Sequence, residues 1–250
     1  MREIEFRPGS LVKSMEPVPQ RYVKLAGWMY LVIIALGIFG EAIVRGSLVV
    51  PGDAGATARA VAADNTLWRA GIAGDLLMHI VDLPVTILLY LLLRAVSRGL
   101  ALIATAFCLT QTAVLVANKM TLVLPLVVHD SAALAAAFTP AQIDALAFTA
   151  IQTHGYGFGV GLIFFGAACI LRGYLVARSG FLPPVLGWLL VAAGVSYLVN
   201  SFALLLAPSI ASALFPAILL PAFVGEFAFA AWLAFKGIDA ERWRACAVAG

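Results

Sequence analysis

The chain has 250 residues, of which 63% are hydrophobic and 12% charged, and its mean hydropathy is +1.01. These values exclude a soluble globular domain and are typical of an integral membrane protein whose main partner is the lipid bilayer. The net charge of +3 is too small to indicate a nucleic-acid-binding surface, so no nucleic-acid partner is expected.

Apolar runs of about 20 residues recur along the chain, and each is long enough to cross a hydrocarbon core of roughly 30 Å as a helix. In chain order they cover residues 24–44, 72–93, 100–128, 156–175, 185–206 and 211–235. Strands are not expected, because an open sheet would leave backbone groups unpaired in lipid and the alternation of a membrane barrel is absent. The predicted fold class is therefore all-α, a polytopic transmembrane bundle of about six helices.

Lysine and arginine gather at alternate ends of these runs, which predicts the orientation because positively charged loops stay in the cytoplasm. We expect a cytoplasmic N-terminal arm over residues 1–23, a six-helix transmembrane domain over residues 24–237, and a cytoplasmic tail over residues 238–250. The basic residues assigned to the cytoplasmic side are Arg2, Arg7, Lys13, Arg21, Lys24, Arg94, Arg98, Arg172, Arg178, Lys236, Arg242 and Arg244.

Two long loops fall on the opposite, outer side. Residues 52–71 and 139–154 are each predicted to form a short amphipathic helix that lies on the outer surface as a lid or collar. Thr139 and Pro140 supply a helix start in the second of them.

Ionisable and other polar side chains interrupt the apolar runs at similar depths. Asp75, His79 and Asp82 are spaced i, i+4, i+7, which places them on one stripe of the second helix. The other runs contribute Glu41, Asn118, Lys119, His154, Asn200 and Glu226. A charge at bilayer depth costs roughly 3 kcal/mol, so such residues face the bundle interior, pair with one another or line water. We therefore expect one polar cavity on the outer side, in which Lys119 neutralises Asp75, Asp82 or Glu226.

The candidate ligand-binding residues are Asp75, His79, Asp82, Lys119, His154, Asn200 and Glu226. Some of the polar residues have a structural alternative. Asp75 and Glu41 could form an ion pair with Arg45 or Arg69 near the interface, and His79 could belong to a static hydrogen-bond network with Asp75 or Asp82.

Three long segments, residues 45–94, 154–202 ("HGYGFGVGLIFFGAACILRGYLVARSGFLPP…") and 220–237 ("LPAFVGEFAFAAWLAFKG"), resemble the bacterial membrane family DUF4386. The resemblance covers the chain from about Leu25 to Gly237. It implies a multi-pass protein of the bacterial inner membrane and supplies no activity. Its recurrent polar positions correspond to Glu41, Arg45, Asp75, Asp82, His154, Tyr156, Asn200 and Glu226. Lys119 and His79 are less typical of that pattern.

Three functions remain open on these grounds. The favoured function is the binding or transport of a small molecule or ion, with Asp82 and Glu226 as proton-coupled carboxylates and Lys119 as their counter-charge. A metal-dependent, hydrolase-like enzyme would hold a divalent ion with His79, His154 and a carboxylate. A noncatalytic scaffold or complex subunit would use the polar core only to fix helix packing. The sequence does not identify a cofactor or a metal.

Overall fold

A computed structural model of the protein describes residues 20–249, and its regular elements in this range are all helical. The first span is formed by α1 (Gln20–Ile38), the π-helix η3 (Phe39–Arg45) and the short α2 (Gly46–Leu48). The others are formed, in chain order, by α4 (Asn65–Leu93); α5 (Arg98–Asn118) with α6 (Met120–His129); α8 (Pro140–Arg178); α9 (Pro184–Leu206); and η4 (Ala217–Leu219) with α11 (Leu220–Phe235). These six are long and apolar enough to cross a membrane, which confirms the predicted all-α, multi-pass bundle.

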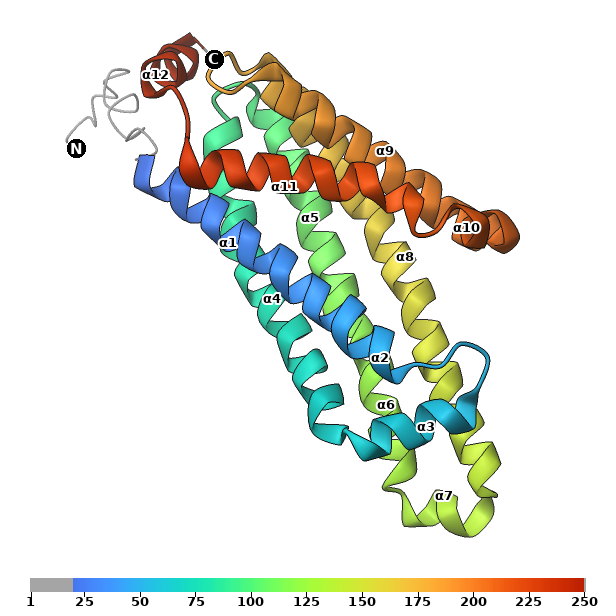
Figure 1. The fold of residues 1–250 in the computed structure, drawn as a ribbon. Helices are drawn as coiled ribbons and strands as arrows, with labels where there is room; N and C mark the ends of the chain where they lie inside the picture. The colour runs from blue at the N-terminus through green and yellow to red at the C-terminus, as the bar shows by residue number, and fades with distance from the viewer. Residues whose placement is uncertain (1–19, 250) are drawn as a thin grey trace, which may run out of the picture.

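The six spans pack side by side in a closed ring. α1 packs against α4, α4 against α5, α5 against α8, α8 against α9, α9 against α11, and α11 returns to α1 (Figure 1). A ring of this kind directs one stripe of every span toward a common interior and leaves the opposite stripe on the outside.

The outward stripes are apolar. On α4, for example, Leu77, Ile80, Leu83 and Ile87 are exposed, whereas Asp75 on the same helix is only 1% exposed. Exposed aliphatic side chains around buried ionisable ones are the distribution expected of a helix that faces lipid on one side and protein on the other.

Both ends of the described chain lie at one end of the bundle, beside α12 (Ala240–Ala249) (Figure 1). The side chain of Gln20 donates hydrogen bonds to the carbonyls of Lys236 and Ile238, each at 3.2 Å. We call the end of the bundle where both ends of the described chain lie the terminal end. The opposite end carries α3 (Ala54–Ala63) and α7 (Ala132–Ala137), and we call it the loop end. Most of the predicted N-terminal arm, including Arg2, Arg7 and Lys13, lies outside the described residues.

The loop end differs from the sequence prediction in both of its helices. α3 is a separate short helix, but it covers only Ala54–Ala63, and residues 65–71 form the first turns of α4. Residues 139–154 form the start of α8 rather than a helix of their own. Thr139 and Gln142 form a capping box at its start, so the predicted helix start is confirmed. No breaker then interrupts the helix for 39 residues, a length of about 58 Å at 1.5 Å per residue, which exceeds the hydrocarbon core.

The sixth run is also divided. Residues 208–214 form α10, a separate helix, and Phe215 is extended before Pro216, so α11 begins only at Leu220. The residue before a proline is disfavoured in the helical region, which explains why one continuous helix over 211–235 does not form.

α8 and α9 approach each other closely along glycines. Gly166 and Gly194 face each other there, and a Cβ atom built on Gly194 would lie 2.5 Å from the carbonyl oxygen of Gly166 and 2.7 Å from Ile170. Small residues are common where membrane helices approach each other this closely.

We predict that Gly194→Leu separates α8 from α9 and lowers the stability of the bundle by about 1–3 kcal/mol, the usual cost of overpacking. Gly99→Leu is the control, because Gly99 is exposed and a Cβ there meets nothing within 4 Å. Thermal unfolding in detergent, followed by circular dichroism, measures the difference. Equal melting temperatures for the two variants would contradict the close α8–α9 contact.

Candidate functional site

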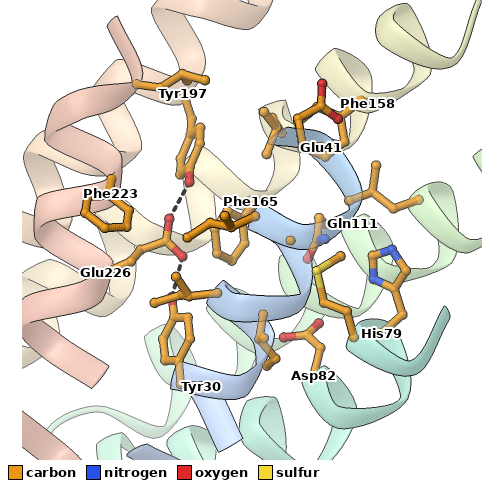
Figure 2. Close-up of a pocket in the computed structure, with 18 of the residues that line it drawn as sticks. Tyr30, Glu41, His79, Asp82, Gln111, Phe158, Phe165, Tyr197, Phe223 and Glu226 are labelled. Carbon is orange, nitrogen blue, oxygen red and sulfur yellow. Dashed lines mark hydrogen bonds between the residues drawn. The ribbon is translucent and has the colours of Figure 1, made fainter. Parts of the chain in front are cut away.

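The interior of the ring contains a cavity of about 370 Å³ lined by residues of all six spans. Its wall is largely aliphatic and aromatic. The polar side chains on it are Tyr30, Glu41, His79, Asp82, Gln111, Tyr197 and Glu226 (Figure 2). Cavities of this volume, mainly apolar with a few polar groups, are typical binding sites for small molecules.

Glu226 is held on one side of the cavity by two tyrosines. Its Oε2 accepts a hydrogen bond from the hydroxyl of Tyr30 on α1 at 2.8 Å, and its Oε1 accepts one from the hydroxyl of Tyr197 on α9 (Figure 2). The carboxyl group is therefore fixed by donors from the two helices on either side of α11. A buried carboxyl group needs such donors, because its desolvation is otherwise uncompensated.

Asp82 lies on another wall of the same cavity, on α4. One oxygen, Oδ2, accepts a hydrogen bond of 2.5 Å from Thr112 on α5. The residue is only partly buried, and the surface that it keeps faces the cavity (Figure 2). Asp82 therefore supplies a carboxyl group that a molecule in the cavity can reach.

Arg172 is a buried cation whose charge acts on these two carboxyl groups. Its buried position differs from the one predicted from the sequence. We assigned it to a cytoplasmic loop, but α8 continues past it to Arg178 and buries it to 5% exposure. Its Nη2 donates to Thr86 Oγ1 at 3.3 Å, and its charge acts electrostatically on both Asp82 and Glu226. The half of the bundle toward the terminal end therefore also contains a buried charge.

Two further side chains on the cavity wall keep hydrogen-bonding atoms without a partner. His79 and Gln111 are 2% and 7% exposed, and within residues 20–249 neither His79 Nε2 nor Gln111 Oε1 has a hydrogen-bond partner. Such atoms are rare in proteins and call for an explanation, of which an unfilled binding site is one.

Asp75 does not line this cavity and forms the centre of a buried ion cluster. Arg45 Nη1 and Lys119 Nζ both donate to Asp75 Oδ2, at 2.8 and 2.9 Å, and Arg45 Nε also pairs with Glu41 at 2.7 Å. The four residues balance two positive charges against two negative ones. The predicted pairing of Lys119 with a carboxylate is realised with Asp75, and so is the alternative pairing of Asp75 with Arg45.

Local backbone features bring the ion cluster together. The third span is interrupted at Lys119, between α5 and α6, where its side chain reaches Asp75. The first span is a π-helix over Phe39–Arg45, a form that occurs mainly at functional or strained positions. A Cβ atom on Gly40, within it, would collide with Asp75 Oδ1, so the carboxylate can approach the first span only at a glycine.

His154 pairs with Asn118 rather than with an ionisable group. Asn118 Nδ2 lies 3.0 Å from His154 Nδ1 and donates to the carbonyl oxygen of His154 at 2.9 Å. Because an amide nitrogen only donates, this contact uses Nδ1 of His154 as the acceptor.

Asn200 lines a second hollow of about 640 Å³ together with Gln152 and Tyr156. This hollow lies between η3 and the helices α8, α9 and α10. It shares four lining residues with the first cavity, which are Glu41, Phe158, Leu162 and Leu219. The two hollows therefore adjoin.

The seven predicted site residues are thus divided among four places. His79, Asp82 and Glu226 line the central cavity, Asp75 and Lys119 form the ion cluster, His154 pairs with Asn118, and Asn200 lines the second hollow. Within residues 20–249, no three histidine, cysteine or acidic side chains form a group that could hold a metal ion. His79 and His154 therefore do not assemble the metal centre that we considered from the sequence.

The sequence analysis missed Tyr30, Tyr197, Thr112 and Arg172. Tyrosine is common near membrane interfaces, and a threonine in a helix usually bonds its own backbone, so neither type marks a site by itself. Arg172 was missed because it lies only six residues before the end of α8, where arginine normally signals topology.

Residues 25–237 match the family described as a domain of unknown function, DUF4386. The chain belongs to the DUF4386 family. This DUF4386 protein is also similar to an uncharacterised protein from Archaeoglobus fulgidus, with 29% identity over 169 residues, which cover 66% of this chain and 83% of the relative. No solved structure matches the chain significantly.

We predict that Asp75→Ala destabilises the protein by about 3–5 kcal/mol, because it leaves Arg45 and Lys119 buried without their shared carboxylate. The double variant Asp75→Asn/Lys119→Met removes one charge of each sign and loses less stability than Asp75→Ala. Glu41→Gln is the control, since the Glu41 side chain is 60% exposed and that of Asp75 is 1% exposed. Unfolding in detergent measures all three, and a double variant less stable than Asp75→Ala would contradict the assigned pairing.

Proposed function

We propose that this DUF4386 protein binds a small molecule in the cavity between its six spans, and that Asp82 and Glu226 exchange protons when the ligand enters or leaves. The observation that carries the proposal is the placement of two carboxyl groups, from α4 and α11, on the wall of one otherwise apolar cavity. Ligand binding coupled to proton exchange is compatible with a transporter and with a ligand sensor.

The balance of buried charge supports proton exchange. Apart from His79 and the tyrosines, the ionisable side chains in or beside the cavity and the ion cluster are four carboxyl groups and three cations; they are Glu41, Asp75, Asp82, Glu226, Arg45, Lys119 and Arg172. Arg45 and Lys119 are engaged by Asp75 and Glu41. Only Arg172 remains for Asp82 and Glu226, and an unbalanced charge in an apolar interior is costly, so one of these two carboxyl groups must take up a proton or a cation.

The second hollow supports a route into the cavity. It adjoins the cavity through Glu41, Phe158, Leu162 and Leu219, and it carries further polar groups on Gln152, Tyr156 and Asn200. We assign this route to the outer half of the bacterial inner membrane, because the basic residues at the ends of the spans favour a cytoplasmic location for both termini.

The cavity and the unpartnered atoms of His79 and Gln111 favour ligand binding over a purely structural core. A scaffold is most stable when its interior is filled and its buried polar atoms are paired. Neither condition holds on this cavity wall.

We predict that N,N′-dicyclohexylcarbodiimide, which reacts with protonated carboxyl groups in apolar surroundings, modifies Asp82 or Glu226 in membranes. The modification should increase as the pH is lowered from about 8 to about 6, because the protonated fraction of the carboxyl group rises. Peptide mass spectrometry identifies the modified residue.

Asp75 is the internal control, because it is engaged by Arg45 and Lys119 and does not line the cavity. Asp82→Asn and Glu226→Gln should each remove the corresponding adduct. Failure to modify either residue, or equal modification of Asp75, would contradict the proposal.

A separate prediction concerns orientation. Single cysteines replacing Ala136 in α7 and Arg244 in α12 lie on exposed positions at opposite ends of the bundle. In a Cys246→Ser background, a membrane-impermeant maleimide added to intact cells should label the first and spare the second. Labelling of Arg244→Cys alone would reverse the proposed orientation.

A further inference from the structure

We propose that the ligand is a monovalent organic cation with an apolar, preferably aromatic, body, and that it replaces the proton on the Asp82 and Glu226 pair. This inference rests on the proposed function, in that it assumes that the central cavity is a binding site, and it names the class of molecule that the cavity accepts.

The fully charged groups on the cavity wall are all acidic. Its lining contains three carboxyl groups, on Glu41, Asp82 and Glu226, and it contains no lysine or arginine. The lining of the adjoining hollow contributes no lysine or arginine either. An anionic ligand would meet only like charge along this path, whereas a cation is attracted along all of it.

The nearby cations do not reverse this balance. Arg45 and Lys119 donate to Asp75, and Arg45 also pairs with Glu41. Arg172 lies outside the lining and donates to Thr86. Because Arg172 can compensate only one of Asp82 and Glu226, the site has room for one additional positive charge. That number fits a monovalent cation and matches the charge of the proton that it replaces.

Other titratable groups surround the two carboxyl groups without supplying that charge. They come from five spans and are Tyr30 on α1, His79 on α4, Cys108 on α5, Cys169 and Arg172 on α8, and Tyr197 on α9. The tyrosines and cysteines carry no positive charge in any state, so apart from Arg172 only His79 could compete with an incoming cation.

Aromatic rings complete the site. Tyr30, Phe165, Tyr197 and Phe223 line the cavity near Glu226, whereas Phe158 lines it near Glu41, and the rings of Phe165 and Tyr197 lie 5.5 Å apart (Figure 2). Aromatic faces attract organic cations and are used to bind quaternary ammonium groups. A cage of rings beside a carboxyl group therefore recognises both the charge and the apolar body of one molecule.

The size and the polar groups of the cavity narrow the class further. A cavity of about 370 Å³ accommodates a molecule with one aromatic ring and a substituted ammonium group. The unpartnered atoms of His79 and Gln111 lie on the wall that carries Asp82 rather than beside Glu226 (Figure 2). They provide hydrogen-bonding capacity for a polar substituent at the other end of the molecule.

The test uses tritiated benzyltrimethylammonium and equilibrium dialysis against the full-length protein in lipid nanodiscs. Its carbon isostere, neopentylbenzene, has the same shape without charge, and phenylmethanesulfonate carries the opposite charge. We expect saturable binding of the cation, at least about tenfold weaker competition by either analogue, and release of up to one proton per cation bound, measured in weak buffer.

Variants locate the binding. Asp82→Asn/Glu226→Gln should abolish cation binding, whereas Glu241→Gln, which removes an exposed carboxyl group on α12, should leave it unchanged. The cation should also protect Asp82 and Glu226 from the carbodiimide, and neopentylbenzene should not. Because this protection is measured on the unaltered protein, it does not depend on the double variant folding.

The outcomes separate the two proposals. Equal competition by neopentylbenzene, stronger competition by the sulfonate, or no saturable binding of the cation overturns the cationic class. If the carbodiimide still modifies Asp82 or Glu226 in that case, the cavity remains a proton-titrating site for another ligand. If the carbodiimide modifies neither residue and the cation does not bind, both proposals fail together.

Discussion

The structure depends on the compensation of buried charge inside an apolar ring of helices. A charged group at membrane depth is too costly to face lipid, so each of the ionisable side chains within the spans must find a donor, an acceptor or a cavity. Asp75 forms ion pairs with Arg45 and Lys119, and Glu226 accepts hydrogen bonds from two tyrosines. Asp82 accepts a hydrogen bond from one threonine and faces the cavity. The helices that carry these partners are thereby held in one arrangement around the interior.

The two groups of carboxylates are compensated in different ways, and this difference has functional meaning. The Asp75 cluster is neutral, and the side chains of Asp75, Arg45 and Lys119 within it are at most 10% exposed, so it fixes the first, second and third spans to one another. Asp82 and Glu226 are stabilised mainly by neutral hydroxyl groups, and they share Arg172. Hydroxyl donors tolerate either protonation state of a carboxyl group better than a fixed ion pair does, because no opposite charge is left unpaired.

Irregular backbone occurs where these groups meet. The π-helix of the first span contains Glu41, Arg45 and Gly40, and the break in the third span falls at Lys119. In membrane proteins, such departures from the regular helix are tolerated where they are buried in protein or line a cavity. Both irregularities lie beside the ion cluster, and Glu41 reaches from the first of them to the lining of both hollows.

The sequence by itself determined the class, the number of spans and nearly all of their positions, because a run of about 20 apolar residues has few stable alternatives to a membrane-spanning helix. It also indicated that Asp75, His79 and Asp82 share a stripe of one helix, since the helical repeat is independent of neighbouring elements. Only the tertiary structure decided which of them share a site. Tyr30 and Glu226 are separated by 196 positions and Lys119 and Asp75 by 44, and the order and rotation of packed helices is set by side-chain contacts between spans that local periodicity does not contain.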